Sequence, residues 1–127
     1  MIKKTIKYTD YNGVEREEDF YFNLNQAELI EIDALHDGNY AAIINEAVEK
    51  KNVSEIMKIF KSFIEKSYGI KSEDGRTFEK SPEITRSFMQ SEAYSELLVE
   101  LANNADAASA FVEGILPKKK TEIKEVK

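Results

Sequence analysis

The sequence contains no cysteine, a single histidine, two prolines and five glycines, each standing alone. The missing cysteines exclude disulfides and thiolate chemistry. Isolated glycines form no phosphate-binding loop, and neither a zinc signature nor a nucleophile elbow is present. No apolar run approaches the length needed to cross a bilayer, and the lysine-rich start lacks the apolar segment of a secretory signal. These absences favour partner binding over catalysis.

Charge is distributed unevenly along the 127 residues, which are 42% apolar and 33% charged. The formal net charge of −6 divides into +3 over residues 118–127 and −9 over residues 1–117. An acidic body repels phosphate backbones, so we expect no nucleic-acid binding and, without an apolar run, no membrane partner. The length predicts one compact domain over residues 1–117, followed by a charged, disordered tail over 118–127.

The first segment of the domain, residues 2–24, has the pattern of a β-hairpin. Its apolar residues fall on even positions, at Ile2, Ile6, Tyr8, Val14, Phe20, Phe22 and Leu24. A two-residue Asn-Gly turn would face the two apolar sets away from each other. A three-residue loop over 11–13, with Gly13 in a left-handed bulge position, instead pairs Ile2 with Phe22. The sequence therefore predicts the bulged loop.

The remaining body, residues 25–117, has helical periodicity. We expect helices over about 26–36, 39–51, 54–67, 82–89, 92–103 and 106–115. The expected caps are an Asn25/Glu28 capping box, Ser54, Ser81 before Pro82, Ser91 and Asp106. The predicted fold class is α+β and mostly helical: an N-terminal antiparallel hairpin followed by five to six helices in one compact domain.

The groups that could support chemistry have simpler structural explanations. His36 lies near a predicted helix end, where a solvated residue is the better interpretation than a metal ligand beside Asp33 and Asp37. The acidic run at 15–19 alternates between strand faces, and residues 72–76 resemble a calcium loop in composition only. We expect no enzyme activity, metal or cofactor.

Tyr21 is the exception on the odd-numbered face of the hairpin. It belongs either to a second face covered by the chain itself or to an exposed aromatic surface. The free strand edges could also accept a strand from a neighbour, so a homo-oligomer stays open as an alternative.

Five segments, residues 7–29, 59–69, 72–76, 91–98 and 110–117, together resemble the tail assembly chaperones of long-tailed phages and prophages of Gram-positive bacteria, in their short form. The resemblance spans nearly the whole chain. It rests on structural motifs and not on a catalytic site.

This resemblance implies a non-enzymatic protein of the host bacterial cytoplasm, which keeps the tape measure protein soluble while tail tube subunits assemble around it. It also implies a longer form made by translational frameshifting. Lys118, Lys119 and Lys120 must be encoded by AAA or AAG codons, on which a ribosome could slip. The alternative is an ordinary solubilising lysine run.

A groove between helices could shield an apolar partner helix. The candidate contact residues late in the chain are Phe88, Phe111, Ile115 and Leu116. A competing hypothesis is a structural virion component, such as a head–tail connector or a tail-completion protein.

Overall fold

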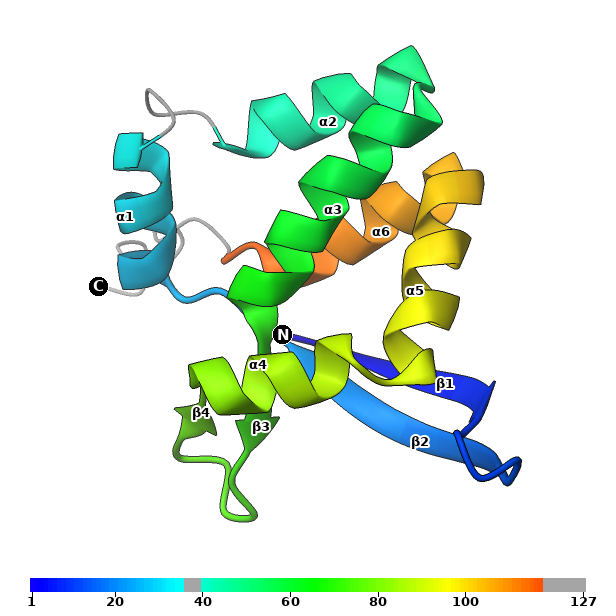
Figure 1. The fold of residues 1–127 in the computed structure, drawn as a ribbon. Coiled ribbons are helices and arrows are strands. Elements are labelled where there is room, and N and C mark those ends of the chain that lie inside the picture. The colour runs from blue at the N-terminus through cyan, green and yellow to red at the C-terminus, as the bar shows by residue number, and fades with distance from the viewer. Residues whose placement is uncertain (36–39, 118–127) are drawn as a thin grey trace.

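The computed structural model describes residues 1–35 and 40–117. Within these ranges it contains four strands and six helices (Figure 1). In chain order they are β1 (Ile2–Thr9), β2 (Glu15–Phe22), α1 (Gln26–Leu35), α2 (Tyr40–Lys50), α3 (Val53–Ser67), β3 (Tyr68–Lys71), β4 (Phe78–Glu79), α4 (Pro82–Met89), α5 (Glu92–Asn103) and α6 (Ala105–Ile115). The predicted α+β class is confirmed. The predicted tail over 118–127, and His36 with the predicted end of the first helix, lie outside the described residues.

The predicted register of the hairpin is confirmed. Ile2 pairs with Phe22 across the ladder. The Asp10 amide donates to the Val14 carbonyl at 2.9 Å, and the Gly13 amide donates back to the Asp10 carbonyl at 2.9 Å. Gly13 has φ 82°, a left-handed conformation that glycine adopts without strain. The bulged loop therefore places the apolar residues of both strands on one face.

Val14 does not join that face. It is 50% exposed, since β2 begins at Glu15 and Val14 only closes the turn. Burial along β2 increases toward its other end, where Phe22 has no exposed surface. The prediction was thus wrong for the first apolar residue of this strand.

Two short strands extend the hairpin into a sheet of order β1-β2-β3-β4 among the described residues. Antiparallel pairing joins Tyr21 to Gly69 and Phe22 to Tyr68, and then Lys71 to Phe78. The sequence indicated only a helix end and a polar turn here, so both strands were missed. Because β3 pairs with β2, one edge of the hairpin is covered by its own chain.

Gly69 permits the close crossing of β3 and β4. A Cβ atom at this position would lie 2.6 Å from Phe78 Cε2 and 2.8 Å from the Glu79 carbonyl oxygen. The second contact is with backbone, which cannot rotate away. A side chain at residue 69 would therefore separate the two strands.

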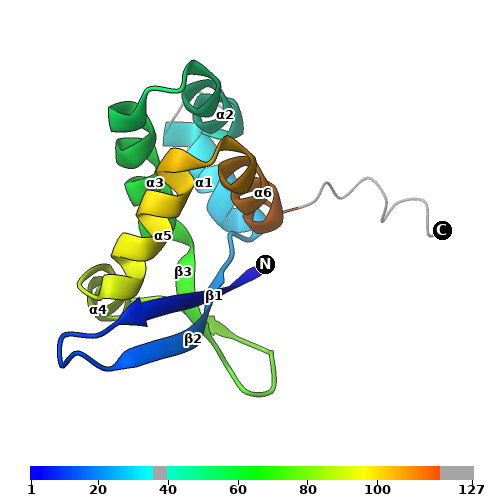
Figure 2. The same ribbon diagram turned by 90° about the vertical axis from the view of Figure 1, so that its right-hand side faces the viewer.

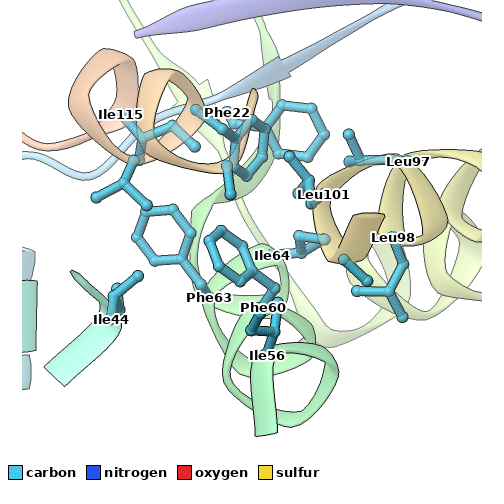
Figure 3. Packing of buried hydrophobic residues seen from close by; sticks show 14 of the residues in the cluster. Phe22, Ile44, Ile56, Phe60, Phe63, Ile64, Leu97, Leu98, Leu101 and Ile115 are labelled. Atoms are coloured by element: carbon cyan, nitrogen blue, oxygen red, sulfur yellow. The ribbon is translucent and has the colours of Figure 1, made fainter. Parts of the chain in front are cut away.

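The hydrophobic core lies where this sheet meets the helices. α5 and α6 pack on β1, α3 packs on α5, and α4 packs on β3 (Figures 1 and 2). Side chains from α3, α5 and α6 point toward one another around Phe22 (Figure 3). The Phe22 ring lies 5.2 Å from the Phe111 ring and 5.7 Å from the Phe88 ring, measured between centroids. One continuous core thus holds strands and helices together.

Helix α1 begins at the predicted capping box. The Asn25 amide donates to the Glu28 carboxylate at 2.9 Å, and the Glu28 amide donates to the Asn25 side-chain oxygen at 2.8 Å. Ser81 caps α4 as predicted, accepting from the Ile84 amide at 3.1 Å. Ser91 occupies the N-cap position of α5, but its hydroxyl donates to the Phe88 carbonyl instead of capping.

Two predicted caps were wrong by two residues. Asn52, and not Ser54, caps α3 by accepting from the Glu55 amide at 3.1 Å. Asn104, and not Asp106, caps α6 in the same manner at 3.0 Å. Both asparagines have the extended backbone of an N-cap, so each helix starts before the predicted residue.

Lys80 joins three separate parts of the fold. Its ammonium group donates to the carbonyl oxygens of Asn23 at 2.8 Å and Lys66 at 2.9 Å. It also bonds both carboxylate oxygens of Glu28, at 3.0 and 2.9 Å. Its side chain is 20% exposed. The ammonium thereby ties the end of β2, the first turn of α1 and the end of α3 to the start of α4.

We predict that Lys80→Met lowers the free energy of unfolding by about 2 kcal/mol, because it removes the cation paired with the Glu28 carboxylate and the ammonium donor of two carbonyls. Lys50→Met is the control, since Lys50 forms an exposed pair with Glu46 at 3.9 Å and should cost less than about 0.5 kcal/mol. Urea unfolding followed by circular dichroism measures both. Equal effects of the two substitutions would contradict the role given to Lys80.

Candidate interaction surfaces

Among residues 1–35 and 40–117, no group of three or more histidine, cysteine or acidic side chains is arranged to hold a metal ion. In the same ranges, no helix combines the length and apolar character needed to span a bilayer.

A charged hollow of about 450 Å³ lies along the tip of the hairpin, against α5. Two of the polar side chains that line it, Tyr8 and Arg16, are paired with the neighbouring Glu18 and Asp10. The Arg16 guanidinium lies 2.6 Å from Asp10 and holds the pKa of that carboxyl below its usual value. The Tyr8 hydroxyl donates to Glu18 at 2.5 Å, which raises the pKa of Tyr8 to about 12. These pairs stabilise the turn of the hairpin.

Three of the candidate contact residues named from the sequence lie in the core. Phe88 is 3% exposed, Phe111 1% and Ile115 0%. Leu116 is half-buried against the same core. The first three side chains are covered by the hairpin and by other helices, so this fold does not present them to a partner.

Tyr21 is half-buried on the outer face of the sheet. Its strand pairs with β3, and the Lys71 ammonium lies 5.7 Å from its ring centroid. The neighbouring odd-numbered side chains are polar, and Thr5 donates to Asp19 at 2.6 Å. Tyr21 is therefore the aromatic ring of an otherwise polar hairpin face, and its apolar neighbour is the half-buried Phe78 of β4, whose ring covers Gly69 opposite Tyr21.

A larger hollow, here called the α3–α4 groove, lies between α3 and α4 and reaches α5. It has a volume of about 760 Å³ and a lining more apolar than polar. The lining residues are Lys61, Glu65, Lys80, Ser81, Pro82, Thr85, Arg86, Met89 and Tyr94. Met89 and Tyr94 pack on the core while staying partly exposed. The groove thus combines an apolar floor with charged rims.

Sequence reasoning missed Met89 and Tyr94 as surface residues. In α4 the adjacent apolar residues Phe88 and Met89 point in different directions, and Phe88 alone reaches the core fully. The sequence feature that could have identified them is the width of the apolar face of α4, which is greater than the area that one neighbouring element can cover.

A second apolar surface is the outer side of α1. Ile30 is 66% exposed and Leu35 80%, and Ile32 is the buried residue of this helix. Ala27 and Ala34 lie exposed on the same side of the helix as Ile30. We call Ala27, Ile30 and Ala34 the α1 outer face; Leu35 lies about 140° around the helix from Ile30 and is not part of it. The helical pattern of the sequence did not distinguish them from core residues.

These features define a small α+β protein whose distinctive described surfaces are an apolar groove and an apolar helix face. The model of the phage tail assembly chaperone family matches residues 1–126. The chain therefore belongs to this family, which is non-enzymatic. Comparisons with curated proteins and with solved structures found no match.

We predict that Phe111→Ala costs about 3–5 kcal/mol of stability, as expected for a buried ring at the centre of the core. Tyr21→Ala should cost only about 1 kcal/mol, because Tyr21 loses one cation contact and half-buried surface. Urea unfolding of both variants measures the difference. A cost for Phe111→Ala as small as that of Tyr21→Ala would show that Phe111 is not a core residue.

Proposed function

We propose that this protein binds the tape measure protein of a long-tailed phage or prophage of a Gram-positive host. It keeps that protein soluble in the host cytoplasm and helps bring tail tube subunits to it. The family match over residues 1–126 carries the proposal, because it assigns the chain to tail assembly.

The α3–α4 groove supports this function. A helix buries its apolar side by laying it into a hydrophobic groove, with charged residues left at the rim. Met89 and Tyr94 supply apolar surface, and Lys61, Glu65 and Arg86 supply both signs of charge at the edges. An amphipathic segment of a helical partner fits this arrangement.

The net charge supports it as well. Residues 1–117 carry a formal charge of −9, which keeps a complex with an apolar partner dispersed through repulsion between like-charged particles. Shielding and dispersion together are what a solubilising chaperone requires.

Co-expression with the tape measure protein encoded in the same phage genome tests the proposal. We expect that protein to be soluble and to co-purify only when this chain is present. Met89→Glu combined with Tyr94→Ser should reduce the soluble fraction, because the change places charge in the groove and removes an aromatic ring. Val99→Glu, at a 50% exposed position on α5 outside the groove, is the matched control.

Insolubility of the tape measure protein in the presence of the unchanged chain would overturn the proposed function. Full solubility of the tape measure protein with the groove variant would instead show that the groove is not the binding site. Circular dichroism of each variant separates loss of binding from loss of fold.

The lysine run at Lys118, Lys119 and Lys120 is proposed as the site where translation slips to make a longer form. We expect the natural gene to yield, beside its main product, a minor larger one that shares its N-terminal peptides. Recoding all three lysines as AAG should abolish the larger product without changing the protein sequence. Mass spectrometry of both cultures measures this, and a larger product that survives recoding would contradict the proposed site.

A further inference from the structure

Helix α1 has apolar residues on both of its sides, although it buries only one. Helices with apolar residues all round normally lie inside a protein. On the inner side, Ile32 is 8% exposed and Leu29 is half-buried. On the outer side, Ile30 is 66% exposed, and Ala27 and Ala34 in the same row are exposed as well. The outer side therefore has the composition of a buried helix face without the cover.

The α1 outer face has the shape that helix packing requires. Ala27, Ile30 and Ala34 follow each other at three- and four-residue spacing, so they form one row along the helix. The small alanines flank the larger Ile30, which lets a second helix approach closely and receive Ile30 between its own side chains. A helix is thus the secondary structure that fits this surface.

Contacts at the α1 outer face are not needed to fix α1 in the fold, because other residues of the helix do so. Lys80 and the capping box fix its first turn, through the Glu28 carboxylate. Near its other end, the Asp33 carboxylate accepts a hydrogen bond from the Tyr40 amide at 3.1 Å. α1 makes few contacts with other elements and stands at the edge of the molecule (Figure 1). A hollow of about 200 Å³ remains beside it, between α1 and α3.

The charge of α1 selects the kind of partner. The helix carries three acidic residues and no basic one. Glu28 is paired with Lys80, and Asp33 accepts the Tyr40 amide, whereas Glu31 lies exposed beside the alanine row. An identical helix from a second copy would bring Glu31 toward Glu31, which like-charge repulsion disfavours. A helix with lysine or arginine next to its apolar stripe complements both the apolar row and the exposed Glu31.

We infer that the α1 outer face is a docking surface for a basic amphipathic helix of a partner protein. This inference deepens the proposed function, on which it rests for the natural partner: a tape measure segment with lysine or arginine flanking its apolar stripe. The surface is distinct from the α3–α4 groove, because the lining of the groove includes no residue of α1.

A synthetic helix tests the inference without the natural partner. The probe is a peptide of leucine, alanine and lysine, about 20 residues long so that it forms a helix in water. A second peptide has glutamate in place of lysine. Titration of the full-length protein, followed by fluorescence anisotropy, should show binding of the lysine peptide that weakens as salt is added, and much weaker binding of the glutamate peptide.

Substitutions in α1 then locate the contact. Ile30→Glu should weaken binding of the lysine peptide by about tenfold or more, because Ile30 is the central apolar contact. Glu31→Lys should weaken the lysine peptide and strengthen the glutamate peptide, which a purely structural role of Glu31 would not do. Val99→Glu and the groove variant should leave binding unchanged. All changed positions on α1 are exposed, and circular dichroism verifies the fold.

Four results would overturn the inference. Equal affinity for both peptides would remove the charge selection, and unchanged binding by Ile30→Glu would place the site elsewhere. Dimerisation of the unchanged protein that Ile30→Glu abolishes would identify a second copy as the occupant. If the tape measure protein is solubilised in co-expression while the lysine peptide fails to bind, the inference is wrong and the proposed function stands.

Discussion

The burial of Phe22 is the interaction on which the other parts of the structure depend. Its ring has no exposed surface and contacts Tyr68 from β3, Phe88 from α4 and Phe111 from α6. Its backbone pairs with Ile2 on one side and with Tyr68 on the other. A shift of the register by one residue would turn this ring toward solvent and a neighbouring residue into the core. The register of the strands and the packing of the helices therefore both depend on the burial of this one side chain.

The elements that local chemistry determines could be predicted from the sequence, and those that depend on distant contacts could not. Alternation of apolar residues and the demand of Gly13 for a left-handed conformation defined the hairpin, and the Asn25/Glu28 spacing defined the start of α1. β3 and β4 contain four and two residues, too few for alternation to be visible. β3 exists because the edge of β2 offers hydrogen bonds to Tyr68 and Gly69, which lie far along the chain, and β4 pairs in turn with β3.

The interaction surfaces were harder to predict for a related reason. Periodicity indicates which residues share a face of a helix, but it does not indicate what covers that face. Phe111 and Ile30 both belong to apolar helical rows, yet Phe111 is 1% exposed and Ile30 66%. The difference arises because the aromatic residues of the hairpin and of α3 converge on Phe111, whereas no described element lies over Ile30. Exposure is a property of the assembled fold.

Lys80 connects the two proposed surfaces physically. It lines the α3–α4 groove, and its ammonium group holds Glu28 in the first turn of α1. The same group bonds the carbonyl of Lys66 at the end of α3. A displacement of α1 relative to the groove would break this charged contact and leave the Glu28 carboxylate without the ammonium group that it pairs with. Lys80 thus links the two surfaces, and a long helical partner that reaches both would gain affinity from each.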